Sequence, residues 1–149
     1  MRVPRFCLAL LVSATALLAT DPIVGTWTYQ HAASKGALLP KSSTVVITEE
    51  GDTNVISVNA VSADGSPFVY KYTLPKKGGA ATNVEGAFDA VSGKLVNPLT
   101  RDMVYMRGGK QVRSAHVVVA KNGKTMKTTI KNMDANGKAV TLTQVYTKQ

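Results

Sequence analysis

Short β-type segments separated by tight-turn dipeptides are the feature that most constrains how this chain can fold. Asn-Gly dipeptides supply the positive φ angles that tight hairpins need, and helical periodicity is weak along the whole chain. The turns Gly108-Gly109, Asn122-Gly123 and Ala135-Asn136-Gly137 divide the C-terminal part into four segments. The strands predicted there are Asp102–Arg107, Lys110–Ala120, Lys124–Asp134 and Lys138–Lys148.

The N-terminal half follows the same pattern, with turns at Glu50-Gly51-Asp52-Thr53 and Asp64-Gly65. The strands predicted there are Ile23–His31, Ser43–Glu49, Asn54–Ala63 and Pro67–Leu74. The connection Ala32–Pro40 has room for one helical turn, and Ala80–Thr100 predicts only short strand fragments because glycines and Pro98 interrupt it. Closing such a series on itself removes exposed sheet edges. We therefore predict an all-β fold, a closed antiparallel up-and-down β-barrel of 8–10 strands.

Residues 1–20 have the three parts of an export signal. Arg2 and Arg5 precede an apolar run over residues 6–18, and small residues follow at Ala19-Thr20. This run is short for a helix that must cross a ~30 Å hydrocarbon core. We predict a signal peptide at 1–20, a barrel domain at 21–149, an exported (periplasmic or secreted) protein, and no integral membrane span in the mature form. An uncleaved membrane anchor is the alternative.

The inventory of cysteine and histidine argues against a metal site or a cofactor. The only cysteine, Cys7, lies in the predicted leader, so the mature chain would have no disulfide and no thiolate ligand. His31 and His116 are isolated and make a poor metal set. We expect local hydrogen bonds for both histidines, with no metal and no cofactor.

Positive charge is concentrated in the last third of the chain. Residues 101–149 carry ten Lys/Arg against two acids, whereas residues 21–100 carry six against seven. A basic half attracts anionic polymers or lipid surfaces, but lysines on the outer face of strands also discourage edge pairing. The lysines are scattered, and Trp27 is the only tryptophan available for base stacking. We therefore predict no nucleic-acid partner; the oligomeric state stays open.

The first predicted strand contains Gly25-Thr26-Trp27, in which Gly25, Trp27 and Tyr29 share one parity. A strand glycine permits close approach of another backbone. We predict that Trp27 points inward as a structural plug at one end of the barrel, with Gly25 beside it; direct ligand contact by Trp27 is the alternative.

Three short motifs resemble the calycin superfamily, which comprises lipocalins, fatty-acid-binding proteins and avidins. Residues 23–27 look like the first strand of a fatty-acid-binding protein, residues 45–53 are similar to its hairpin after the lid, and residues 143–148 resemble its last strand. The whole chain more broadly resembles exported bacterial lipocalin-like proteins of unassigned function. Ala32–Ser42 is too short for the helical lid of fatty-acid-binding proteins, and a single tryptophan argues against biotin.

The resemblance implies a small hydrophobic ligand inside the barrel. The family's carboxylate-binding arginine aligns with Gln144, which suggests an uncharged polar ligand end, and Tyr146 matches a family tyrosine. A barrel of this size is either filled by side chains or holds one small ligand. The residues predicted to contact the ligand are Tyr29, Phe68, Tyr70, Tyr72, Gln144 and Tyr146.

The sequence contains no recognisable catalytic constellation. Glu49, Glu50 and Asp52 cluster at a turn, where solvent denies them the burial that would tune a pKa. Ser34 and Ser114 have no evident base nearby. We therefore predict a non-enzymatic binding protein. The alternatives are a module whose basic C-terminal strands contact an anionic partner, and an enzyme without identifiable catalytic residues.

Overall fold

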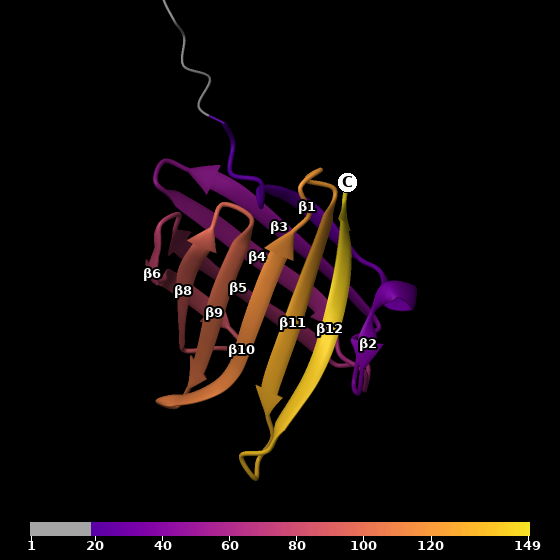
Figure 1. Cartoon of the computed structure of the whole chain (residues 1–149). Helices are drawn as coiled ribbons and strands as arrows, with labels where there is room; N and C mark the ends of the chain where they lie inside the picture. Colours follow the sequence, from indigo (N-terminus) through magenta and orange to yellow (C-terminus); the bar gives the residue numbers. More distant parts are fainter. Residues whose placement is uncertain (1–18) are drawn as a thin grey trace, which may run out of the picture.

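The computed structural model describes residues 19–149, whose strands form one antiparallel sheet rolled around a common interior (Figure 1). In Figure 1, β8–β12 cross the front of the molecule, while β1, β3, β4 and β5 pass behind them. The predicted all-β, calycin-like barrel is confirmed, and it is nearly closed. Residues 1–18 of the predicted leader, with Cys7, lie outside the described residues.

The strands follow the chain in the order that the turn pattern predicts. The strands of the first half are β1 (Gly25–Tyr29), β2 (Lys35–Gly36), β3 (Ser42–Glu50), β4 (Thr53–Val61), β5 (Pro67–Pro75) and β6 (Gly78–Ala80). Those of the second half are β7 (Thr82–Gly86), β8 (Ala90–Asn97), β9 (Thr100–Arg107), β10 (Lys110–Val119), β11 (Thr125–Met133) and β12 (Ala139–Lys148). The turn between β9 and β10 has φ of 56° at Gly108 and 73° at Gly109, which is the positive pair that a two-residue hairpin uses.

The two edges of the sheet are joined through β6 and β7. β6 pairs with β8, whereas β7, which follows after Ala81 alone, pairs with β5. Ala81 continues the ladder, because its N–H donates to the Val91 carbonyl at 2.8 Å. At the end of β7, a Cβ on Gly86 would lie 2.2 Å from the Val69 carbonyl oxygen, so only glycine fits there. One interrupted strand therefore bridges the two edges of the sheet.

This seam explains how the strand count differs from the prediction. Twelve strands are present within residues 19–149, against the 8–10 predicted. β2 is a two-residue addition beside β12, and β6 and β7 are parts of one interrupted strand. Ten strands thus encircle the interior. The up-and-down order holds except at the seam, where β6 and β7 exchange neighbours.

Two predicted segments differ in detail from the structure. The first strand spans Gly25–Tyr29, which is shorter than the predicted Ile23–His31, and a short 3₁₀ helix at His31–Ala33 begins in the last predicted strand residue and continues into the connection that had room for a helical turn. The segment 80–100 contains a continuous eight-residue strand, β8. Pro98 does not interrupt that strand, because it lies in the turn that leads to β9.

Inward-facing side chains alternate along each long strand and form one core. On β5, Tyr70, Tyr72 and Leu74 are buried and Phe68 is half-buried, so the predicted common face is confirmed. Leu142 of β12 and Val91 of β8 belong to the same cluster. Among residues 19–149, no helix has the length and apolar character that crossing a bilayer requires.

Trp27 is buried near one end of the barrel, which we call the closed end; its role as a plug stays a prediction. Its side chain is 0% exposed, and its indole Nε1 donates to the Ile23 carbonyl at 2.8 Å. Lys148 Nζ lies 4.9 Å from the indole ring centroid and donates to the Pro22 carbonyl. The inward position predicted for Trp27 is therefore found. The opposite end, with β2 and the β11–β12 turn, lies lowest in Figure 1, and we call it the mouth.

Replacing Trp27 tests the contribution of this plug. We expect Trp27→Ala to lower the free energy of unfolding by about 3–5 kcal/mol, because it leaves a cavity in the core. Trp27→Phe keeps most of the apolar volume and loses the indole hydrogen bond, so about 1–2 kcal/mol is expected. Urea unfolding followed by circular dichroism measures both. Equal losses for the two variants would contradict a role based on volume.

Candidate functional site

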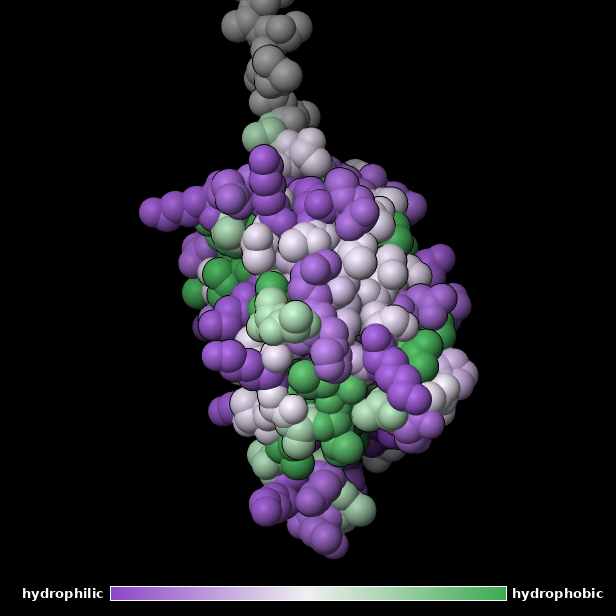
Figure 2. Space-filling view, turned by 90° about the vertical axis from the view of Figure 1, so that its right-hand side faces the viewer, coloured by the Kyte–Doolittle hydropathy of each residue, from purple (hydrophilic) through white to green (hydrophobic). Residues whose placement is uncertain are grey.

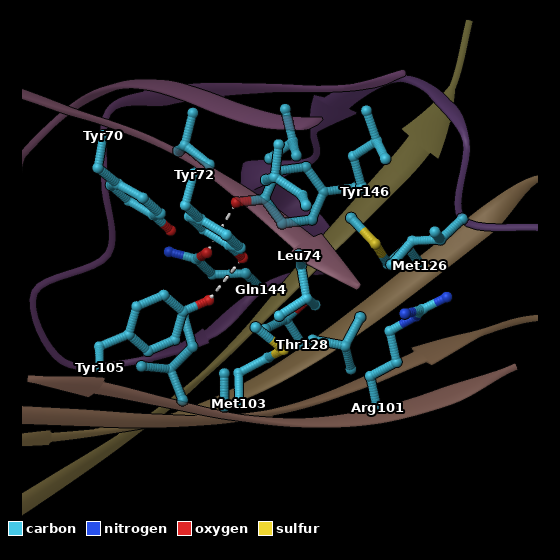
Figure 3. A pocket seen from close by; sticks show the side chains of 18 of the residues that line it. Tyr70, Tyr72, Leu74, Arg101, Met103, Tyr105, Met126, Thr128, Gln144 and Tyr146 are labelled. Carbon is cyan, nitrogen blue, oxygen red and sulfur yellow. Dashed lines mark hydrogen bonds between the residues drawn. The ribbon is translucent and has the colours of Figure 1, made fainter. Parts of the chain in front are cut away.

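The barrel encloses a narrow space, the inner cavity, of about 70 Å³. Its wall comes from β3–β5 on one side and β9–β12 on the other. Figure 3 shows tyrosines grouped at one end of this space and Arg101 at the other, with Leu74, Met103 and Thr128 between them. The interior is therefore largely filled by side chains, and a limited space remains.

A second space of about 290 Å³, the mouth hollow, lies at the open end beside the inner cavity. The two spaces share Val58, Tyr70, Arg113, Gln144 and Tyr146, so these residues form the neck between them. Beyond the neck, the wall of the mouth hollow includes apolar side chains from the strand ends and from the connection after β2. The two spaces are therefore adjacent, one inside the barrel and one at its open end.

The rim of the mouth hollow carries an exposed leucine. Leu38 lines the hollow, is 77% exposed and has φ of 57°. This left-handed conformation costs a residue with a Cβ roughly 1–2 kcal/mol. Figure 2 shows a hydrophobic patch on the lower half of the face that contains β2 and β12. The open end is therefore apolar at its edge as well as inside.

Three tyrosines from β5 and β9 pack together beside the neck. Tyr70 and Tyr72 are stacked with an interplanar angle of 2°, and the Tyr105 ring lies edge-on to both. The Tyr72 and Tyr105 hydroxyls are 3.3 Å apart. Burial raises the pKa of all three phenols, and for Tyr70 the nearby Arg113 charge opposes this only in part. These hydroxyls stay protonated at neutral pH and can donate hydrogen bonds.

Gln144 and Tyr146 of β12 form a second polar group at the neck. The Tyr146 hydroxyl donates to Gln144 Oε1 at 2.8 Å and also lies 3.2 Å from Ser43 Oγ. Burial raises the pKa of Tyr146. Because Gln144 Oε1 accepts from Tyr146, its Nε2 group is left as a donor, and Figure 3 shows it on the Tyr70 side. The neck therefore presents mainly donors.

Arg113 of β10 adds a positive charge to the neck. Its guanidinium lies 4.9 Å from the Phe68 ring centroid and 5.3 Å from that of Phe88. Its Nε donates to Asn132 Oδ1 at 2.7 Å, which fixes the plane of the group. Stacking on aromatic rings holds a cation that faces an otherwise apolar space. The sequence analysis missed Arg113, although it shares the parity of Ala115 and Val117, which are buried on the same strand.

A buried polar cluster lies at the closed end of the inner cavity. Arg101, which is 6% exposed, forms an ion pair with Asp21, and Asn54 Nδ2 donates to Asp21 Oδ2 at 2.9 Å. Asp21 Oδ1 accepts from the Ile23 N–H at 3.2 Å. The sequence analysis missed this cluster too, because its members are far apart in the chain.

The residues predicted to contact a ligand occupy different positions. Tyr70, Tyr72, Gln144 and Tyr146 line the inner cavity, whereas Phe68 lines only the mouth hollow. Tyr29 lines neither space; it packs against Tyr146, with ring centroids 5.7 Å apart. Contact of any of them with a ligand stays a prediction.

The histidines lie outside these spaces. His31 packs edge-on against Tyr29, and His116 Nδ1 lies 2.6 Å from Asp102 Oδ1 on the exposed surface. Within residues 19–149, no group of three or more His, Cys, Asp or Glu side chains is placed to hold a metal ion.

Comparisons with known proteins support the fold. No family model matches the chain, and no curated protein sequence matches it. The S-type phycobiliprotein lyase CPES from Guillardia theta is similar in structure, with a TM-score of 0.53 and 9% identity over 87% of this chain and 89% of that one. The zebrafish ileal bile acid-binding protein, complexed with cholic acid, gives a TM-score of 0.50 and 11% identity over 86% and 99%.

A third solved structure, EF1p2_mFAP2b bound to DFHBI, gives a TM-score of 0.50 and 15% identity over 86% of this chain and 94% of that one. At these identities the likeness concerns the fold alone. The chain thus has the nearly closed antiparallel barrel of calycin proteins.

The buried phenols predict how the protein responds to alkali. Their pKa values are raised in the folded state above the ordinary value of 10.0. The stability that they contribute is therefore fully present below about pH 10 and is lost as the pH rises further. Above that pH, we expect tyrosinate absorbance to increase and the circular dichroism signal to fall in the same cooperative unfolding step. Ionisation of all tyrosines at the value found in urea, with the fold intact, would contradict the burial.

Proposed function

We propose that this chain binds a compact, largely apolar small molecule reversibly, with the ligand seated in the mouth hollow and its end in the inner cavity. The observation that carries the proposal is that a space inside the barrel and a space at its open end meet at Tyr70, Arg113 and Gln144. The mouth hollow, about 290 Å³, lies near the lower limit of about 300 Å³ for small-molecule pockets. A compact ligand therefore suits it better than a long one that must lie wholly inside.

The apolar walls supply the affinity in this proposal. Each Å² of apolar ligand surface removed from water contributes about 25 cal/mol. Phe68, Leu142 and Ala60 line the mouth hollow, and Ile56, Val117 and Met103 line the inner cavity. These side chains offer the ligand no directional hydrogen bonds, so the polar groups of the neck set its orientation.

The neck favours a hydrogen-bond acceptor on the ligand. Gln144 Nε2, the Arg113 guanidinium and the protonated tyrosine hydroxyls are all donors. From Gln144 alone, the sequence favoured an uncharged ligand end; Arg113 extends this to an acidic group. We propose that the ligand places a carbonyl, phenolate or carboxylate oxygen between Gln144 and Arg113.

Two structural neighbours are consistent with this proposal. One of these barrels is bound to DFHBI and another is complexed with cholic acid. They support the capacity of the fold to hold small molecules; the ligand of this chain is argued from its own neck residues. A fold alone does not specify a function.

Removing the charge at the neck tests this function. We expect saturable binding of both anilinonaphthalene sulfonate, which is anionic, and Nile red, which is neutral. Arg113→Gln should lower the affinity for the anionic probe about tenfold, because a charge-assisted hydrogen bond is lost. Nile red affinity should change less than about twofold. Fluorescence titration measures both.

Lys131→Gln is the matched control, because it removes the same charge from an exposed residue on neighbouring β11. It should leave both affinities unchanged. Failure of the wild-type protein to bind either probe would contradict the proposed function. An equal loss in both arginine and lysine variants, abolished by salt, would instead support the anionic partner on the outer surface.

We further propose that the chain is exported and acts in the periplasm or outside the cell. The support is the sequence of residues 1–20, in which positively charged residues are followed by an apolar run and then by small residues. Because Asp21 is tied to Arg101 and Asn54, we expect the mature chain to start at or before Asp21. Intact mass of the exported protein reports the cleavage point. A mass that retains Met1 would contradict the signal peptide, and a start beyond Asp21 would contradict the need for that clamp.

A further inference from the structure

Asn54 places a buried hydrogen-bond acceptor at the deep end of the inner cavity. It is 1% exposed, lines the cavity and has no partner for its Oδ1 within residues 19–149. The orientation of its amide is set by a neighbour, because Nδ2 lies 2.9 Å from Asp21 Oδ2. The opposite orientation would bring two acceptor oxygens together. The oxygen is therefore the side-chain atom left to seek a donor.

An unpaired buried carbonyl oxygen has an energetic cost. Leaving such a group without a partner costs about 1–3 kcal/mol, and apolar surroundings offer it nothing. The other polar side chains at this end are Arg101 and Thr128. Arg101 is already engaged by Asp21 and by the Lys76 carbonyl. A ligand that brings a donor to Asn54 would recover this cost.

The charges around Asn54 select the kind of donor. An ammonium group would approach the Arg101 guanidinium, whose charge opposes it, while the Asp21 carboxylate is already paired. A carboxylate or ether end has only acceptors and would face Oδ1 unfavourably. A neutral hydroxyl can donate to Oδ1 without a charge penalty.

We propose that the deep end of the inner cavity is a subsite for a ligand hydroxyl, which donates to Asn54 Oδ1. This inference rests on the proposed function and narrows its ligand class. The end of the ligand that enters the inner cavity then has an acceptor at Gln144 and Arg113 and a hydroxyl at Asn54, with a short apolar segment between them. Figure 3 shows the tyrosine group at one end of the inner cavity and Arg101 at the other.

Matched pairs of ligands test the subsite in the wild-type protein. Hexanoic and octanoic acids, which are short enough to be compact ligands, are each compared with their ω-hydroxy counterparts by isothermal titration calorimetry. In an apolar cavity a terminal hydroxyl weakens binding, because it loses its water contacts. Here we expect at least one ω-hydroxy acid to bind about three- to tenfold more tightly than its parent.

A variant at Asn54 tests whether the preference for the ω-hydroxy acid comes from this residue. Asn54→Leu removes the acceptor, so the ω-hydroxy acid should bind no better than its parent, or more weakly. Asn59→Leu, the same change at an exposed position of β4, should keep the wild-type preference. The ratio of the two affinities within each protein isolates the hydroxyl contact from general effects on stability.

The outcomes separate this proposal from the one on which it rests. If each ω-hydroxy acid binds the wild-type protein with the same affinity as its parent acid, or more weakly, the hydroxyl subsite is overturned while ligand binding stands. If no acid of either series binds, both proposals fail. If Asn54→Leu does not fold, the wild-type comparison still decides.

Discussion

The buried ion pair between Asp21 and Arg101 is the contact on which the closed end of this barrel depends. It fixes the segment before β1 against β9, so that Ile23 lies where the Trp27 indole can donate to its carbonyl. Asp21 also sets the orientation of the Asn54 amide. Breaking one partner of a buried pair leaves an uncompensated charge, which costs more than the pair itself contributes. One ion pair thus holds the plug and shapes the base of the cavity.

The neck has a different physical basis. Aromatic rings of Tyr70, Tyr72 and Tyr105 pack edge-on and stacked, which leaves their hydroxyls together in a space poor in acceptors. Burial keeps these phenols neutral and therefore donating. Arg113 is held against this group by its stacking on Phe68. The apolar walls and the donor-rich neck together favour a ligand that is mostly hydrophobic and carries an acceptor.

Sequence patterns predicted the parts of the site that follow local rules. Tyr70 and Tyr72 lie at alternate positions of one strand, so their shared face could be inferred from period-two spacing. Gln144 and Tyr146 were indicated only by the resemblance of the last strand to that of fatty-acid-binding proteins. Tyr29 has the right parity yet lines neither space, because the bulk of Tyr146 lies beside it. Arg113 and Arg101 were missed because basic residues were assigned to the outer face, although each shares the parity of buried apolar residues on its strand.

The sequence by itself determined the class of fold, the hairpin order and the inward position of Trp27, because turn residues and alternation act between close neighbours in the chain. Only the tertiary structure decided how the sheet closes, with β6 and β7 pairing to opposite edges. It alone brought Asp21 to Arg101, eighty positions away. Such contacts form when the rolled sheet brings distant strands across one interior, and no local pattern encodes the size of the space that remains.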